Sequence, residues 1–552
     1  MCLGGFGMSF EILDRDLLAR IGKLETKSGK LETPLLFPVI NPGIQPISPK
    51  RLEEEFGCKA LITNAYIINK NFKETAIQKG LHNFLDFNGS IMTDSGAYQL
   101  LIYKDIDVTP KEIVNFQEAI DTDIGTMLDI PTGWDVPKKY ARYTVNETLK
   151  RAKKLKKMIT RNDLIWVGPV QGGQYFDLVA KSANEMGKLP FQIHALGSPT
   201  PVMEQYKFGV LVNMIMAAKM NLPPDRPLHL FGAGHPFMFS LAVALGCDFF
   251  DSAAYALFAR QDRYLTESGT NRLDELKYFP CSCPVCSNRD PETFRALPKK
   301  IRQKLLAEHN LHVSFSELNQ IKQAISEGRL WEHMEQRSYG HPSLLRALKE
   351  LRKYDEYLER HSPITKRSGI FFFSSIGLSR PEVIRYKKRL KRYSPPPKAK
   401  ILLLLPQTRK KPFHSSKEHS TLMNKIQKTL ENKVDLIHIC TYSAPFGVVP
   451  TELDEVYPIS QNEITFPLDI ETIKYVAEQI SNYITETDYK QVILLRDPLT
   501  WKGKISRACK RSCEKKKILF KTSHKIDPWS QSTIDDFILM LENSIISLKK
   551  TN

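Results

Sequence analysis

Three aspartates follow short apolar runs in the first half of the chain, and together they could act as acid, base and nucleophile. Asp94 opens the segment Asp94-Ser95-Gly96, Asp129 ends an apolar run, and Asp251 precedes Ser252. Two carboxylates in one site can divide the work of nucleophile and general acid/base. A single aspartate after a strand is more often a helix N-cap. The prediction of a catalytic site therefore depends on the three aspartates occurring together.

Glycine and amide residues occupy equivalent positions after other apolar runs. These segments are Gln171-Gly172-Gly173, Gly197-Ser198 and Gly232-Ala233-Gly234-His235. Glycines allow a ligand to approach the backbone closely, and the amide adds donors and acceptors. Combined with three carboxylates, the pattern predicts a site for a flat ligand that forms hydrogen bonds.

A cysteine cluster predicts a metal site. Cys281, Cys283 and Cys286 form C-x-C-x₂-C, and His309 follows at a distance suited to a fourth ligand. Three thiolates and one imidazole match a closed, structural zinc site, with one Zn²⁺ per chain. An iron–sulfur cluster would need a fourth cysteine, and Cys247 lies too close to the predicted ligand site. His312, one helical turn further on, is the second candidate for the fourth ligand.

The elements that must position these residues alternate between strands and helices. Helical spacing of apolar residues recurs in Pro110–Ala119, Val145–Thr160 and Pro201–Lys219. Eight such units predict a parallel α/β fold, and eight is the number of strands in a closed (β/α)₈ TIM barrel, whose active site lies at the carboxyl ends of the strands. An open doubly wound sheet would show the same alternation. The predicted strands are Thr33–Val39, Ala60–Thr63, Ile91–Thr93, Gly125–Leu128, Leu164–Val170, Gln192–Leu196, Leu228–Phe231 and Asp248–Phe250.

The second half of the chain is organised differently. We predict a catalytic domain over residues 8–360, in which about 278–330 form a zinc-binding subdomain. Residues 361–400 form a basic linker, because 385–400 contain eight Lys or Arg, no acid and three consecutive prolines. A smaller α/β domain then covers residues 401–552. Its predicted strands are Ile401–Leu405, Leu436–Cys440, Val492–Leu495 and Ile518–Lys521.

The amino-acid composition of the chain indicates which kinds of partner the protein can have. The chain has 552 residues, 79 Lys and Arg against 61 Asp and Glu, and a formal net charge of +18. This excess favours a polyanionic partner. No apolar run is long enough to span a bilayer, nothing at the N-terminus resembles a secretion signal, and nine cysteines are too few for a disulfide framework. We therefore expect a cytoplasmic protein without membrane contact.

Seven segments resemble the tRNA-guanine transglycosylases, and three of them are closest to the archaeal type. The segments are TDSGAYQL (93–100), MLDIPTG (127–133), VQGGQY (170–175), HALGS (194–198), HLFGAGHP (229–236), CDFFDSAAYALFARQDRYLT (247–266) and YFPCSCPVCS (278–287). The resemblance covers about residues 8–360, in order and spacing. It implies a zinc-bearing barrel that exchanges guanine 15 in the D-loop of tRNA for 7-cyano-7-deazaguanine (preQ0), an archaeosine precursor.

The resemblance also implies a role for each site residue. Asp251 would attack the ribose C1′, and Asp94 would act as general acid/base; the reversed assignment of these two stays open. Asp129 would bind one edge of the purine, and Gln171, Gly172 and the Leu196–Gly197 backbone the other. Tyr98 and Phe231 would stack on its two faces, although Phe231 could instead be an ordinary core residue.

Downstream the chain departs from the archaeal pattern. No PUA module, a small tRNA-binding domain, is recognisable in 500–552, so a separate PUA-containing chain or the basic stretch Arg385–Lys400 would supply that grip. The family also implies a homodimer. LPQTRKKPFHSSKEH (405–419) partly resembles archaeosine synthase, but Gln407 and Phe413 replace its Cys and Tyr, which argues against amidine formation at Lys411.

Two further functions compete with base exchange. One is a tRNA-binding subunit whose barrel has lost its activity, and the presence of all three aspartates argues against it. The second is a plain retaining glycosidase, which the cysteine cluster and the net charge disfavour. Base exchange in tRNA is therefore the function that the sequence favours.

Overall fold

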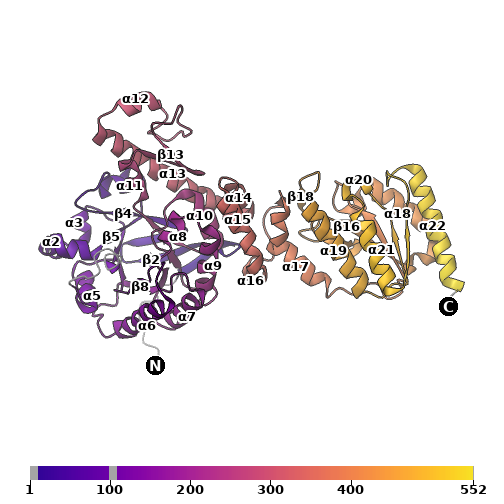
Figure 1. Cartoon of the computed structure of the whole chain (residues 1–552), viewed down its shortest axis with the longest axis horizontal. Helices are drawn as coiled ribbons and strands as arrows, with labels where there is room; N and C mark the ends of the chain where they lie inside the picture. The colour runs from indigo at the N-terminus through magenta and orange to yellow at the C-terminus, as the bar shows by residue number, and fades with distance from the viewer. Residues whose placement is uncertain (1–9, 98–107, 551–552) are drawn as a thin grey trace. The chain divides into compact units, whose positions relative to one another are not determined.

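The computed structural model describes residues 10–97 and 108–550, which form two compact units (Figure 1). Unit 1 comprises Met1–Tyr354 and His361–Pro363, and unit 2 comprises Asp355–Arg360 and Ile364–Asn552. In the described part of the chain, no helix has both the length and the apolar composition needed to cross a membrane.

Unit 1 contains a closed barrel of eight parallel strands, in the order β10-β11-β4-β5-β6-β7-β8-β9. All eight strands predicted from the sequence are confirmed, each with ends within two residues of the prediction. The closed barrel excludes the open doubly wound sheet. The strands are β4 (Leu35–Ile40), β5 (Ala60–Asn64), β6 (Ser90–Asp94), β7 (Ile124–Thr126), β8 (Ile165–Val170), β9 (Ile193–Leu196), β10 (Leu228–Leu230) and β11 (Phe249–Ser252).

A small antiparallel sheet, which the sequence did not lead us to expect, covers the amino-terminal end of the barrel. It consists of β1 (Phe10–Asp16), β2 (Ala19–Thr26) and β3 (Gly29–Glu32). Its Leu24 and Leu31 are buried in one apolar cluster with inward-facing barrel residues such as Met92 and Val167. The sheet therefore covers one end of the barrel, and the cavity described below lies at the carboxyl ends of the strands.

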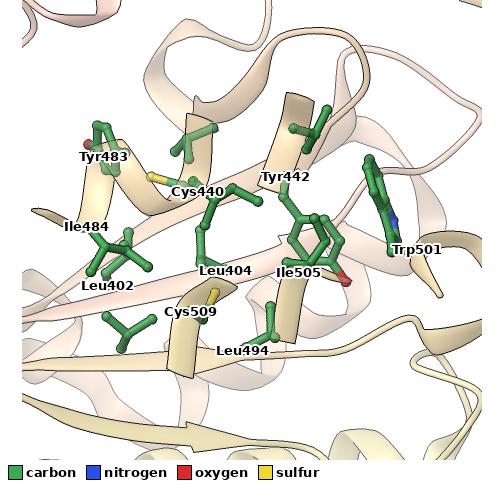
Figure 2. Packing of buried hydrophobic residues seen from close by; sticks show 14 of the residues in the cluster. Leu402, Leu404, Cys440, Tyr442, Tyr483, Ile484, Leu494, Trp501, Ile505 and Cys509 are labelled. Atoms are coloured by element: carbon green, nitrogen blue, oxygen red, sulfur yellow. The ribbon is translucent and has the colours of Figure 1, made fainter. Parts of the chain in front are cut away.

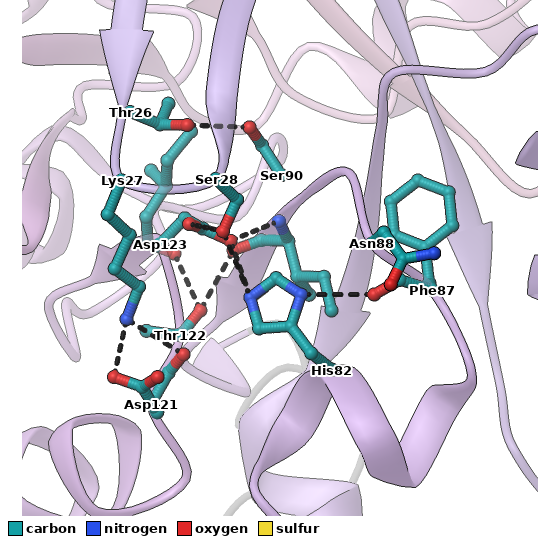
Figure 3. A network of polar contacts seen from close by, with 12 residues as sticks. Thr26, Lys27, Ser28, His82, Phe87, Asn88, Ser90, Asp121, Thr122 and Asp123 are labelled. Atoms are coloured by element: carbon teal, nitrogen blue, oxygen red, sulfur yellow. Dashed lines mark hydrogen bonds and ion pairs between the residues drawn. The ribbon is translucent and has the colours of Figure 1, made fainter.

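Polar contacts fasten this sheet to the loops that enter the barrel strands (Figure 3). The Thr26 hydroxyl lies 2.7 Å from that of Ser90 at the start of β6. Asp123, directly before β7, accepts hydrogen bonds from the Ser28 hydroxyl and from the backbone N–H of Ile91. Because Asp123 is buried, these partners satisfy a carboxylate that would otherwise be costly to bury.

The remaining elements of the barrel are mainly helices that follow the strands. The predicted helix Pro110–Ala119 is confirmed as α5. The predicted helix Pro201–Lys219 is wrong as a single element, because Tyr206 has a φ of 54° and separates α8 from α9. The helices are α1 (Pro49–Glu54), α2 (Ala65–Lys79), α3 (Leu81–Leu85), α5 (Pro110–Ala119), α6 (Lys138–Leu155), α7 (Phe176–Gly187), α8 (Thr200–Glu204), α9 (Phe208–Lys219), α10 (Phe239–Ala244) and α11 (Ala254–Arg260).

A hairpin and a group of helices complete unit 1. The hairpin follows α11, and the long helix α13 runs beside it and packs on α11. These elements hold the cysteine cluster between β13 and α12. They are β12 (Arg263–Thr266), β13 (Gly269–Arg272), α12 (Pro291–Ala296), α13 (Lys299–Glu327), α14 (Leu330–Ser338) and α15 (Pro342–Glu350).

Unit 2 is built on a five-stranded sheet of order β17-β16-β15-β19-β20, in which only β17 is antiparallel. The predicted C-terminal α/β domain and its four strands are confirmed, and β17 is an addition. The strands are β15 (Ile401–Pro406), β16 (Ile437–Ser443), β17 (Gly447–Pro450), β19 (Gln491–Leu494) and β20 (Leu519–Thr522), with a separate pair β14 (Ile370–Phe372) and β18 (Asn462–Ile464). The helices are α16 (Asp355–His361), α17 (Pro381–Leu390), α18 (Lys417–Leu430), α19 (Ile470–Glu486), α20 (Pro498–Trp501), α21 (Lys504–Lys516) and α22 (Gln531–Lys550).

The central strand β15 shows why the sheet is covered on both faces. All its residues are buried. Leu402 and Leu404 join the cluster that includes residues of α19 and α21 (Figure 2), whereas Leu403 and Leu405 join a second cluster with residues of α18 and α22. Successive side chains of a strand point to opposite faces, so an uninterrupted apolar run requires helices on both sides.

Part of the predicted basic linker forms helices and a strand. Within 361–400, residues 381–390 form α17 in unit 2. Arg385 is buried, and its guanidinium donates to the Glu359 carboxylate at 3.0 Å. It therefore does not belong to the exposed phosphate-binding surface that the charge run predicted, whereas Arg389, Lys391 and Arg392 are exposed.

Candidate active site

The three aspartates come together in a cavity of about 690 Å³ at the carboxyl end of the barrel. Asp94 ends β6, Asp251 lies in β11, and Asp129 follows β7. Since parallel strands of a closed barrel end at the same rim, residues far apart in the sequence meet there. The predicted grouping of Asp94, Asp129 and Asp251 in one site is present.

Asp94 lies in an environment that disfavours its charged form. Burial raises the pKa of Asp94 to about 7, and the negative charges of Asp129 and Asp251 contribute to the rise. The amide of Asn64, at the end of β5, donates to Asp94 Oδ2 at 2.9 Å. A carboxyl group that titrates near neutral pH can both donate and accept a proton, which suits a general acid/base.

Asp129 is held by the side chain of Gln171. Gln171 Nε2 donates to Asp129 Oδ2 at 2.6 Å, and Gln171 Oε1 accepts from the Thr132 N–H at 3.0 Å and the Ser198 hydroxyl at 3.2 Å. A Cβ on Gly197 would lie 2.3 Å from Gln171 Nε2, so a larger residue there would displace the Gln171 amide. Burial raises the pKa of Asp129 to about 6 even though the Gln171 bond lowers it.

Asp251 is fixed through one oxygen only. Its Oδ1 accepts hydrogen bonds from His229 Nε2 at 2.9 Å and from the Gly232 N–H at 2.8 Å. Its Oδ2 accepts no hydrogen bond from the residues that the structure describes. The His229 ring is buried and packed between Phe37 and Phe231, with centroid distances of 5.7 and 4.6 Å. Asp251 thus has one anchored oxygen and one that can react.

The other predicted ligand-binding residues differ in their position relative to the cavity. Gly197 and Phe231 line the cavity. Leu196 is buried at the end of β9, and Gly172 packs against α7, where an added Cβ would lie 2.6 Å from the Val179 nitrogen. Tyr98 lies outside the described residues.

The predicted metal ligands meet at one point. Donor atoms of Cys281, Cys283, Cys286 and His309 all lie within 4.8 Å of one another. His309 Nδ1 is 3.4 Å from both Cys283 Sγ and Cys286 Sγ, while its Nε2 donates to the Leu265 carbonyl at 2.9 Å. That hydrogen bond fixes the tautomer in which Nδ1 is free to bind a metal.

The surroundings of the cluster also fit a metal site. The Tyr264 ring stacks on His309 with a centroid distance of 3.6 Å. His312, the second candidate ligand, is not part of the cluster and stacks instead on Phe56 at 4.5 Å. The Cys₃His cluster could therefore hold one metal ion through four protein donors.

Comparison with known proteins gives matches in both halves of the chain. Residues 15–343 match the family model described as queuine tRNA-ribosyltransferase, and residues 383–538 match a model described only as a domain of unknown function. The tRNA-guanine(15) transglycosylase of Methanocaldococcus jannaschii is 46% identical over 473 residues, which cover 84% of this chain and 70% of that protein. The enzyme of the same name from Methanosarcina mazei is 45% identical over 461 residues, covering 83% of this chain and 88% of that protein.

The chain belongs to the tRNA-guanine transglycosylase family. The resemblance seen in the sequence motifs is thereby confirmed. The transglycosylase family match and the barrel also agree in extent, because the match begins in β1 and ends in α15.

The structure of this transglycosylase adds site residues that sequence reasoning missed. His229 forms a hydrogen bond with Asp251, Asn64 forms one with Asp94, and Trp134 lines the cavity. For His229 a signal was available: a histidine between two leucines in a barrel strand must face opposite to them. For Asn64 and Trp134 we find no signal, since polar residues after strands and aromatic residues in loops are common.

Proposed function

We propose that this protein replaces guanine 15 of tRNA by 7-cyano-7-deazaguanine, as a tRNA-guanine(15) transglycosylase. The observation that carries this proposal is the convergence of Asp94, Asp129 and Asp251 on one cavity, with Asp94 titrating near pH 7 and Asp251 anchored through a single oxygen. The names of the relatives support the same substrate. In this proposal the partners are tRNA and the incoming base, while a homodimer and a separate PUA-containing chain remain predictions of the resemblance.

The proposed chemistry is a double displacement. Asp251 Oδ2 attacks the ribose C1′ and the C1′–N9 bond to guanine breaks, which leaves the tRNA covalently attached to Asp251. The incoming base then attacks C1′ from the opposite side and releases the carboxylate. Two inversions retain the glycosidic configuration, as in retaining glycosidases. His229 and the Gly232 N–H hold Oδ1 and so direct Oδ2 toward the substrate.

Asp94 would transfer the protons. In its neutral form it donates a proton to the departing guanine, and the carboxylate formed takes a proton from the incoming base. Its pKa of about 7 makes both forms accessible at neutral pH.

Asp129 and Gln171 would recognise the base. A carboxylate can accept from the adjacent N–H groups on one edge of a guanine-like ring. The Gln171 donor binds Asp129 in this structure, so direct contact of this amide with the base requires that bond to be exchanged. Phe231 lines the cavity and offers a stacking face, and Tyr98 is proposed for the opposite face from the resemblance alone.

We assign the metal site to a structural zinc. All four donors come from the protein, so no position is left for a substrate or water. Bound zinc would join the segment Cys281–Cys286 to α13, and the Leu265 carbonyl would link both to β12.

A covalent-adduct experiment tests the division of roles. Wild-type protein incubated with unmodified tRNA should give a tRNA–protein adduct on denaturing gels, and Asp251→Asn should give none while still binding tRNA. Asp225→Asn, a change at an exposed aspartate, is the matched control and should behave as wild type. An adduct that persists in Asp251→Asn but disappears in Asp94→Asn would reverse the assignment.

A further inference from the structure

Helix α6 begins next to the cavity and lies beside α7 on the outside of the barrel (Figure 1). Residues 131–134, which precede it, line the cavity. In a barrel, the helix that follows a strand starts at the carboxyl ends of the strands, so the first turns of α6 lie on the cavity side. Any surface that these turns present would be beside the substrate.

The outer face of these first turns is basic. Lys139 and Arg142 are exposed, and no ion pair with another described residue neutralises either of them. The first turn contains no acid, and no side chain caps the helix. Lysines at a helix N-terminus oppose the helix dipole, so helix stability does not explain this choice of residues.

Two tyrosines lie among these charges. Tyr140 and Tyr143 are 48% and 53% exposed, and their ring centroids are 5.9 Å apart. The two tyrosines share one side of the helix with Lys139 and Arg142. Lys139 lies three residues before Arg142 and four before Tyr143, and Tyr140 lies three before Tyr143. Exposed aromatic rings between cations match surfaces that bind single-stranded nucleic acid, where rings stack on bases and cations contact phosphates.

The loop before α6 connects this face to the cavity wall. Trp134 lines the cavity, and the ammonium of Lys207 lies 5.9 Å from its ring centroid. Tyr175 donates a hydrogen bond to the Val136 carbonyl at 2.8 Å, and the Lys138 ammonium lies 5.7 Å from the Tyr175 ring centroid. The path from the cavity to the exposed face is therefore short and structured.

We propose that Lys139, Tyr140, Arg142 and Tyr143 form an RNA-binding surface, here called the α6 surface, for nucleotides that flank the guanine in the cavity. The inference rests on the proposed function. A guanine that enters the barrel must leave its stack, so neighbouring nucleotides lose stacking partners. The tyrosines replace that stacking, and Lys139 and Arg142 bind the adjoining phosphates.

The same helix offers a matched control. Lys153 and Lys154 are also exposed, but they lie about 20 Å further along α6, toward the opposite end of the barrel. Lys153→Ala/Lys154→Ala therefore removes the same charge as Lys139→Ala/Arg142→Ala without touching the α6 surface.

The test measures tRNA affinity by fluorescence anisotropy over a range of salt concentrations, with thermal melting to verify folding. Lys139→Ala/Arg142→Ala should weaken binding at low salt and flatten the slope of log affinity against log salt by about 0.7–0.9 per lost phosphate contact. Tyr140→Ala/Tyr143→Ala should weaken binding by about fivefold or more with little change in slope. Lys153→Ala/Lys154→Ala should match wild type in both.

Three results would overturn the inference. The two charge-removing double variants could lower affinity and slope equally, which would indicate a general charge effect. Folded Lys139→Ala/Arg142→Ala and Tyr140→Ala/Tyr143→Ala variants could bind tRNA as wild type does. The tyrosine variant could instead change the oligomeric state in analytical ultracentrifugation without affecting tRNA binding, which would make the surface a protein contact. Guanine exchange into tRNA by the wild type, measured in parallel, separates these outcomes from failure of the proposed function.

Discussion

Asp94 shows how strongly position within the fold controls a residue's chemistry. Its carboxyl group lies against two other carboxylates in a cavity, and burial raises its pKa to about 7. An ordinary aspartate is ionised at that pH and could not serve as an acid. The same arrangement makes the folded protein less stable when Asp94 carries its charge.

This cost predicts a pH-dependent effect of Asp94→Asn. The raised pKa means that the folded state holds the proton more tightly than the unfolded chain, so stability is lost as pH rises from about 4 to about 7. Asparagine removes the charge, so Asp94→Asn should raise the free energy of unfolding above pH 8 by about 1–4 kcal/mol relative to its effect near pH 4. Denaturant unfolding at the two pH values measures this difference.

The exposed Asp225→Asn variant serves as the control and should show no such pH dependence. An equal effect of Asp94→Asn at both pH values would contradict the raised pKa.

At the scale of elements, the metal cluster joins the segment between β13 and α12 to helix α13. Its cysteines lie in a segment between β13 and α12, without a helix or strand of its own, and His309 is part of the 29-residue helix α13. The segment has apolar contacts of its own, since Val285 is buried and the Phe279 ring lies 5.4 Å from the rings of Tyr264 and Phe294, and metal ligation would add to its ordering.

Removal of one ligand should therefore release the metal. We expect Cys283→Ala to lose about one zinc per chain and to melt at a lower temperature, because binding free energy is coupled to local folding. His309→Ala should also lose zinc, or bind it at least about tenfold more weakly. Metal content by mass spectrometry of the purified proteins gives the result.

His312→Ala is the matched control, since it removes a histidine from the same helix one turn away and should keep its zinc. Full zinc content in His309→Ala together with loss in His312→Ala would show that the fourth ligand is assigned incorrectly.

The whole molecule has separate hydrophobic cores in its two units. The barrel core includes Met92, and unit 2 has its own clusters, one of which includes Leu404. Both side chains are fully buried. Units with separate cores often unfold in separate transitions.

Leu404→Ala should then lower the melting temperature of one transition only. Truncating a buried leucine costs about 2–5 kcal/mol, which corresponds to a shift of several degrees in a unit of this size. Met92→Ala, which also truncates a buried apolar side chain but in the barrel, should lower the melting temperature of the other transition. Differential scanning calorimetry resolves the two, and a single transition that both variants shift equally would contradict the prediction.

Much of this protein could be predicted from its sequence because the controlling interactions are local. Strands β4 to β11 follow from short apolar runs, β15 from an uninterrupted apolar stretch, and the metal ligands from the spacing of Cys281, Cys283 and Cys286. Asp94, Asp129 and Asp251 were identifiable because each lies at or just after the carboxyl end of a strand. In a parallel barrel that position alone puts a residue at the active rim.

Only the tertiary structure decided which residues hold these groups. His229 binds Asp251 because β10 and β11 are neighbours in the closed barrel, and Gln171 binds Asp129 because β7 and β8, which precede them, are also neighbours. The sequence placed Arg385 in an exposed basic run. In the structure its side chain is buried and forms an ion pair with Glu359, which lies outside that run. Spacing along the chain reports which element a residue belongs to. The partners, the burial and hence the pKa of a residue depend on other residues that folding brings near it. A local sequence pattern does not contain those residues.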